Sequence, residues 1–201
     1  NSHAPFYSKI NELLYLDTPE FYNEWKLSDV LKERMAFIER VVCDKDDMIS
    51  TAGFAFIEGV VLYASFAYLK HFQSQECGKD LITNICRGIN LSVADENTHA
   101  VGSALLHNKI VEEVKLTPEQ QQKKDDTILE LAKNVYLHEE GIVDRIFAKG
   151  EITGITKKNM NDFVKHRINL ILGSLRYAEL FPKEELDNYV ASWFYTNINS
   201  V

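Results

Sequence analysis

The chain has 201 residues, of which 45% are hydrophobic and 26% charged, a composition that is ordinary for a folded globular protein and argues against disorder and against a coiled-coil rod. This length is enough for one sizeable core, and we expect residues 1–201 to form a single domain. The net charge of −8 disfavours nonspecific binding to nucleic acid or anionic lipid, because phosphate groups repel an acidic surface.

The composition also limits the cellular setting. The most apolar run, 53–69, is interrupted by Glu58 and falls short of the roughly 18 consecutive apolar residues that a membrane span requires. The three cysteines are odd in number and have no CxxC spacing, so neither a disulfide framework nor a thiolate zinc site is expected. We therefore predict a cytoplasmic protein with no membrane and no nucleic-acid partner.

Helical periodicity dominates the first half of the chain. A first helix is predicted over 3–16, and a second begins at Thr18-Pro19, because Thr can cap a helix and Pro suits its first turn. Ser28 or Asp29 caps a third helix that continues to about residue 41. A fourth helix, apolar on nearly all sides, surrounds Glu58 and ends before residue 77.

The second half is predicted to contain four more helices. A long fifth helix covers 79–115, and a sixth begins at Thr117 and closes at Gly150. Thr156 opens a seventh helix that reaches about residue 181, and Pro182 begins the eighth. The short connections make neighbouring helices antiparallel, so the predicted fold class is all-α, a helical bundle.

Glu58 is the most informative single residue, because it lies in an apolar helix. An ionised carboxylate buried without a partner costs several kcal/mol or acquires a strongly raised pKa, so it needs a cation, a proton or a metal. One interpretation is that Glu58 meets an Arg or a water at a helix crossing. The other is that it binds a metal.

Glu96 and His99 form a Glu-x-x-His on the fifth helix. Side chains at i and i+3 project from the same face, so the carboxylate and the imidazole can reach one ion together. A solvated pair is the ordinary alternative, but the apolar neighbours favour burial. In ferritin-like dinuclear proteins two helices each give a Glu and two others each give a Glu-x-x-His, so Glu58, Glu96 and His99 would be half of such a site. Carboxylate and imidazole ligands suit iron or manganese.

The first residues extend this pattern. Asn1-Ser2-His3 has the form of the end of a Glu-x-x-His, and Tyr7 lies one helical turn after His3 on the same face. A disordered terminal histidine and an ordinary core tyrosine are the alternatives. The missing ligands would then lie on helices upstream of Asn1.

These residues resemble the radical-generating small subunit of class I ribonucleotide reductase, and the resemblance covers nearly the whole chain. His3–Tyr7 is similar to the family's His-x-x-x-Tyr, and the segment 55–60 with Ser65-Phe66-Ala67 resembles its helix with a metal-binding Glu. The most specific segment is 95–99, which is similar to the family's Asp-Glu-x-x-His. The segments 143–150, 154–155 and 163–164 resemble later helices and the turn between them.

The resemblance implies a ferritin-like bundle of which this chain is the C-terminal part, with metal ligands at His3, Glu58, Glu96 and His99. It implies a dinuclear iron centre, or a manganese/iron one, that activates oxygen to generate a tyrosyl radical on Tyr7. By the same likeness, Leu62 and Phe66 line a dry pocket around Tyr7. Asp95 is implied to link a metal-bound histidine to the radical-transfer route.

The resemblance also implies partners. They are the N-terminal half of the small subunit, a second small subunit in a homodimer, and the large subunit, which would receive the radical and reduce ribonucleotides to deoxyribonucleotides for DNA replication. A split gene, an intein insertion and a truncation would each explain a start at Asn1-Ser2, and the flexible tail that docks on the large subunit is expected to be missing. Tyr189, Trp193 and Tyr195 are interpreted as packing aromatics.

Several positions depart from the family pattern. Ala94 stands where an Arg is usual, Ser92 stands where the radical pocket is ordinarily apolar, and the interval from Glu58 to Glu96 is slightly long. Two other functions remain open. A ferritin-like oxidase would use the metals directly on a substrate, and a metal-free helical assembly module would use Glu58, Glu96 and His99 as buried polar pairs.

Overall fold

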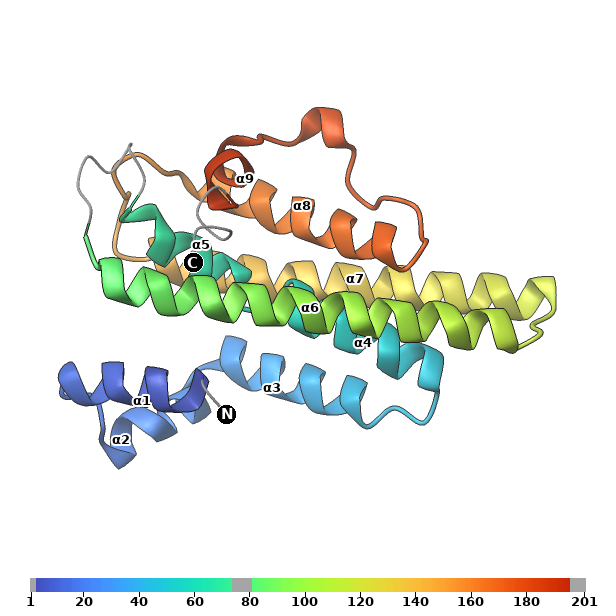
Figure 1. Ribbon diagram of the computed structural model, residues 1–201, viewed down its shortest axis with the longest axis horizontal. Coiled ribbons are helices and arrows are strands. Elements are labelled where there is room, and N and C mark those ends of the chain that lie inside the picture. Colours follow the sequence, from blue (N-terminus) through green and yellow to red (C-terminus); the bar gives the residue numbers. More distant parts are fainter. Residues whose placement is uncertain (1–2, 74–80, 196–201) are drawn as a thin grey trace.

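The computed structural model describes residues 3–73 and 81–195, and these residues fold into a bundle of helices (Figure 1). The expected boundaries at residues 77 and 79, and Asn1-Ser2, lie outside the described residues. The elements are α1 (His3–Leu13), α2 (Pro19–Asn23), η1 (Glu24–Leu27), α3 (Asp29–Val42), α4 (Asp47–Gly59), α5 (Tyr63–His71), α6 (Thr83–Glu113), α7 (Pro118–Phe147), α8 (Lys157–Ser174), η3 (Lys183–Glu185) and α9 (Tyr189–Phe194).

The predicted helix starts are confirmed where a capping residue marks them. Thr18, Ser28, Thr117 and Thr156 each accept a hydrogen bond from a backbone N–H in the first turn, and the last two form capping boxes. The predicted all-α class is confirmed as well: in the described part of the chain the only β pairing is an isolated bridge between Ile152 and Ile155.

Two predicted helix ends were wrong. The first helix stops at Leu13 instead of residue 16, because Tyr15 has a φ of 57° and the N–H of Leu16 bonds to the carbonyl of Asn11 (2.8 Å). The seventh stops at Ser174 instead of about residue 181, because Arg176 has a φ of 65° and the N–H of Tyr177 bonds to the carbonyl of Leu172 (2.9 Å). Both are Schellman ends without the usual glycine, so the sequence carries no stop signal there.

The predicted fourth helix is two helices. The carbonyl of Phe56 accepts from both Val60 (2.9 Å) and Val61 (3.3 Å), and Leu62 then adopts a left-handed φ of 80° before α5 begins. A widened turn of this kind inside a helix often lies at a functional site. Here it follows directly after Glu58.

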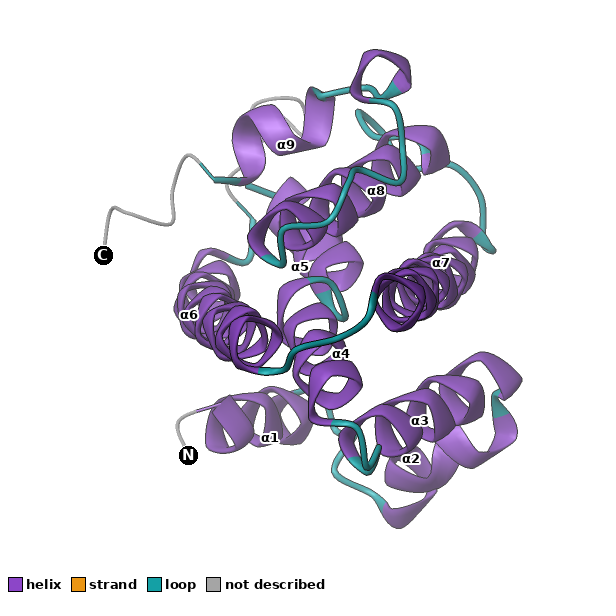
Figure 2. Ribbon diagram, turned by 90° about the vertical axis from the view of Figure 1, so that its right-hand side faces the viewer, coloured by secondary structure: helices purple, strands orange, loops and turns teal. Residues whose placement is uncertain are grey.

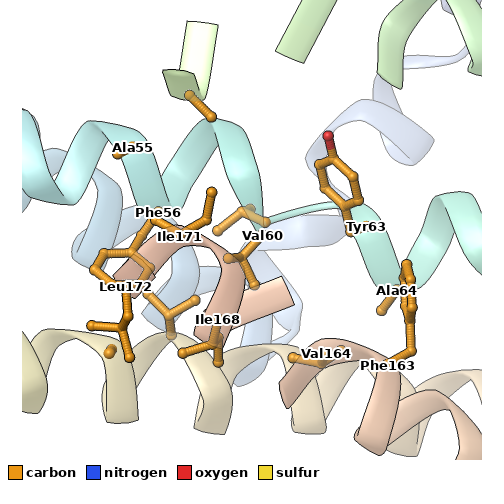
Figure 3. Packing of buried hydrophobic residues seen from close by; sticks show 14 of the residues in the cluster. Ala55, Phe56, Val60, Tyr63, Ala64, Phe163, Val164, Ile168, Ile171 and Leu172 are labelled. Carbon is orange, nitrogen blue, oxygen red and sulfur yellow. The ribbon is translucent and has the colours of Figure 1, made fainter. Parts of the chain in front are cut away.

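The α4–α5 pair forms the centre of the bundle, with α3, α6, α7 and α8 around it (Figure 2). Its apolar side chains interlock with those of α8, as Phe56, Val60, Ile168 and Leu172 show (Figure 3). Among the described residues, Asp47–His71 is the one helical segment long and apolar enough to cross a membrane, but 61% of its most apolar window is buried. The buried core helix of a protein outside the membrane can have the same length and apolar composition. These two properties are therefore weak evidence that the segment crosses a membrane.

Glycine controls how closely α1 approaches α6. A Cβ added at Gly88 would lie 2.0 Å from Cζ of Phe6, so only glycine lets the Phe6 ring lie against α6. This contact fixes α1, and with it His3 and Tyr7, beside the face of α6 that carries Ser92, Asp95 and Glu96.

Candidate metal centre

Glu58, Glu96 and His99 point at one another. The Nδ1 atom of His99 lies 3.1 Å from a carboxylate oxygen of Glu58 and 3.1 Å from one of Glu96, and the three ligand atoms all lie within 4.8 Å of one another. Glu58 comes from the last turn of α4, and the other two from adjacent turns of α6. The structure thus brings together three of the four residues expected to bind metal.

The carboxylates of Glu58 and Glu96 interact with each other and with the imidazole of His99. Burial and the neighbouring Glu96 together raise the pKa of Glu58 to about 7, although His99 opposes both. Burial alone would raise the pKa of Glu96 too, but hydrogen bonds from Glu58 and His99 outweigh it and lower that pKa. The hydrogen bonds with Glu96 and Glu58 raise the pKa of His99. Glu58 and His99 therefore keep their protons to a higher pH than usual, and a divalent cation would displace those protons.

Two charged side chains hold the chain at the helix break next to Glu58. Arg167 of α8, 1% exposed, donates from Nε to the carbonyl of Gly59 (2.8 Å), and its guanidinium carbon lies 3.9 Å from the Tyr63 ring centre. On the other side, the fully buried Glu139 of α7 pairs with Arg34 of α3. Burial outweighs the lowering effects of Arg34 and of the backbone amides of Leu62 and Ala64, so the pKa of Glu139 is raised to about 7. A break that would otherwise strand backbone groups in the core is thereby stabilised.

Sequence reasoning missed these partners. Arg34, Glu139 and Arg167 are far from Glu58 in the chain and belong to no motif. The one signal in the sequence is a charged residue at an apolar position of a helix, as Arg167 is in α8. Such a residue is buried only when it has a partner, so its position predicts a buried polar contact.

His3 lies beside this cluster and contacts α6 through both ring nitrogens. Its Nδ1 lies 3.0 Å from Oγ of Ser92 and its Nε2 lies 3.1 Å from a carboxylate oxygen of Asp95. A protonated His3 would lower the pKa of Glu96 by its charge, because the imidazole is close to the cluster. Asp95 thus contacts the histidine that was expected to bind metal.

Tyr7 lies one turn further along α1 and is half-buried. Its hydroxyl lies 3.1 Å from Oγ of Ser92, and its ring packs edge-on against Phe6. Burial raises its pKa. Two residues were expected to line a dry pocket around Tyr7. Phe66 is buried, as a dry pocket requires, whereas Leu62 is 44% exposed.

A known protein family matches this chain over nearly its whole length. The sequence profile of the family described as "Ribonucleotide reductase, small chain" matches residues 1–188. The chain belongs to the ribonucleotide reductase small chain family. The match spans all of the residues expected to act in the site.

One curated protein resembles this chain in sequence, and one solved structure resembles it in fold. The chain is 27% identical over 131 residues to a protein of Invertebrate iridescent virus 3 described as ribonucleoside-diphosphate reductase small subunit 048L. The matched residues make up 65% of this chain and 34% of that protein. It shares the fold of a Bacillus halodurans crystal structure described as a class I ribonucleotide reductase, with a TM-score of 0.71, 21% identity, and coverage of 87% of this chain and 61% of that one. This member of the ribonucleotide reductase small chain family thus spans only part of the length of either relative.

The donor set fits the metal chemistry of the ribonucleotide reductase small chain. Two carboxylates and an imidazole nitrogen within reach of one point are ligands that iron and manganese accept. A proton-sharing acid pair in a partly buried position also gains from exchanging its protons for a cation, because the cation removes the carboxylate repulsion.

Proposed function

We propose that this chain is part of the small subunit of ribonucleoside-diphosphate reductase, within one ferritin-like domain, and that it holds half of a dinuclear iron or manganese/iron site together with a radical-forming tyrosine. The observation that carries the proposal is the convergence of Glu58, Glu96 and His99 from two helices onto one point, in a member of this family. A metal-free module would have no need to bring two partly buried acids together at one point.

Each residue then has a distinct role. Glu58, Glu96, His99 and His3 hold the metals, and the centre when loaded supplies the one-electron oxidation. Tyr7 gives up an electron and its phenolic proton, and the half-buried position slows quenching of the resulting radical. Asp95 accepts the Nε2–H of His3 (3.1 Å), which keeps Nδ1 as the nitrogen with a free lone pair.

The chain needs partners to complete the site. Four protein ligands are fewer than the six of a ferritin-like dinuclear site. The face of α6 around the site is open, since His99 and Asp95 are each 55% exposed and Leu91 and Leu105 expose most of their apolar surface. We propose that the upstream part of the small subunit covers this face, that small subunits pair, and that the large subunit receives the radical in the cytoplasm and reduces ribonucleotides.

The test is metal loading of the chain combined with a polypeptide that carries the upstream part of the small subunit. We expect two iron ions per complex and, after exposure to oxygen, a tyrosyl radical signal in electron paramagnetic resonance. Glu58→Gln should lower the metal content, because an amide cannot supply a negative oxygen ligand. Glu130→Gln on the exposed face of α7 is the matched control and should load normally.

The outcomes separate the competing functions. A complex that binds no metal would exclude the reductase proposal in favour of a helical assembly module. Tyr7→Phe should bind two metals and lose the radical. If Tyr7→Phe instead retained full turnover of a substrate oxidised at the metals, the chain would be a ferritin-like oxidase.

A further inference from the structure

Ser92 is a buried hydroxyl that joins two residues of the site. It is 1% exposed, and its Oγ lies 3.1 Å from the hydroxyl of Tyr7 and 3.0 Å from Nδ1 of His3. His3 and Tyr7 lie on one face of α1, one helical turn apart, so a single side chain on the facing turn of α6 reaches both. Four side chains, Asp95, His3, Ser92 and Tyr7, are thereby linked in a row by contacts of 3.0 to 3.1 Å.

The direction of these hydrogen bonds follows from their chemistry. A carboxylate can only accept, so Nε2 of His3 donates to Asp95 and Nδ1 carries the lone pair. Ser92 has a single proton, and beside a neutral His3 that proton is donated to Nδ1. The hydroxyl of Tyr7 therefore donates to Oγ of Ser92.

We propose that Ser92 is a positioning residue that holds the phenol of Tyr7 through a hydrogen bond to its buried Oγ. The inference rests on the proposed function for the role of Tyr7, but the bond itself belongs to the metal-free chain. If a metal takes the lone pair of Nδ1, Ser92 loses that acceptor and its proton turns to the oxygen of Tyr7. An oxidised Tyr7, which has no proton to donate, would then still be hydrogen-bonded.

Valine and threonine at position 92 form a matched pair for the test. The two side chains have the same shape, and only threonine keeps the hydroxyl, so Ser92→Val removes the bond without opening space for a water. Ultraviolet resonance Raman spectra of tyrosine contain a doublet whose intensity ratio differs between a phenol that donates, one that accepts and one without a hydrogen bond. Subtracting the spectrum of a Tyr7→Phe variant isolates Tyr7 from the other eight tyrosines among the nine of the chain.

In the metal-free 201-residue chain we expect the Tyr7 doublet of a hydrogen-bonded phenol. Ser92→Thr should retain it, and Ser92→Val should lose it. A wild-type Tyr7 without a hydrogen bond, or identical doublets in the Val and Thr variants, would overturn the proposal. If both variants fail to fold, as judged by circular dichroism, the wild-type doublet alone decides.

A second measurement uses the loaded complex. Hydrogen bonding to the oxygen of a tyrosyl radical lowers its largest g value, so we expect a lowered value in the wild type and in Ser92→Thr and a higher one in Ser92→Val. Equal g values in the Val and Thr variants would contradict the proposal. If no radical forms in any of them, the proposed function fails, while the Raman doublet of the metal-free chain still decides whether Ser92 binds Tyr7.

Discussion

At the scale of single residues, the same amino acid serves two purposes in the core. Glu58 and Glu139 both have a pKa raised to about 7 by burial. Glu139 faces the guanidinium of Arg34, whose positive charge balances a negative charge on the carboxylate. A metal ion would have to displace Arg34 to bind there. Glu58 faces another acid and an imidazole, both of which ligate metals. The identity of the neighbours, and not burial, separates a structural carboxylate from a candidate ligand.

These shifts predict the pH dependence of stability in the metal-free chain. A folded-state pKa of about 7 against an ordinary value of 4.5 means that the folded chain binds more protons between these pH values. The free energy of unfolding should therefore fall as pH rises from about 4.5 to about 7, by up to about 1.4 kcal/mol per pH unit for each such group.

Urea unfolding at pH 5 and pH 7.5 measures this dependence. Glu139→Gln cannot titrate, so its unfolding free energy should change less with pH than that of the wild type. Glu130→Gln, on the exposed side of the same helix, should keep the wild-type dependence. A Glu139→Gln variant with the full wild-type slope would show that Glu139 is ionised throughout this range.

At the scale of elements, the site depends on how helices approach each other. The side chain of Phe6 occupies the space that a Cβ at Gly88 would need, so α1 packs on α6 through a ring resting against bare backbone. Since His3 and Tyr7 are carried on α1, this one contact sets their distance from Ser92 and Asp95.

Gly88→Ala should therefore destabilise the chain. The added methyl group must displace the Phe6 ring, and overpacking of this kind costs about 1–3 kcal/mol. Gly102→Ala is the control on the same helix, because nothing lies within 4 Å of a Cβ there, and alanine should stabilise an open helical position by up to about 1 kcal/mol. Urea unfolding of both variants compares them, and equal unfolding free energies would show that α1 is not held by this contact.

At the scale of the whole molecule, the bundle is open on the side of the site. The central α4–α5 pair is enclosed by α3, α6, α7 and α8, whereas the α6 face around His99 is exposed (Figure 2). Both relatives are longer than this chain, which spans 34% of one and 61% of the other. An additional segment from the same family would bury apolar surface on that face.

Adding the upstream polypeptide of the small subunit should raise the melting temperature of the chain, and metal should raise it further. A ligand at one hundred times its dissociation constant adds about 2.7 kcal/mol to the free energy of unfolding. Amide hydrogen exchange should slow on α1 and α6 and stay unchanged on α9, which lies on the side of the bundle opposite α1 (Figure 1). Protection spread evenly over all helices, or none at all, would contradict the proposed docking face.

Local sequence patterns predicted the helical class, the capped starts of the helices and the grouping of Glu58, Glu96 and His99. These features follow from local rules, since hydrophobic periodicity, Thr and Ser caps and an i, i+3 spacing all act within a few residues. An acid in an apolar helix was a signal for the same reason: its burial is costly wherever the helix packs.

Only the tertiary structure decided the break after Glu58, the two Schellman ends and the hydroxyl that joins His3 to Tyr7. Each depends on groups that are distant in the chain or on backbone conformations that leave no mark in composition. The break is held by Arg167 and Glu139 from two other helices, and Ser92 meets Tyr7 only because Gly88 lets α1 approach α6. Such contacts arise from the packing of whole elements, so local sequence patterns do not encode them.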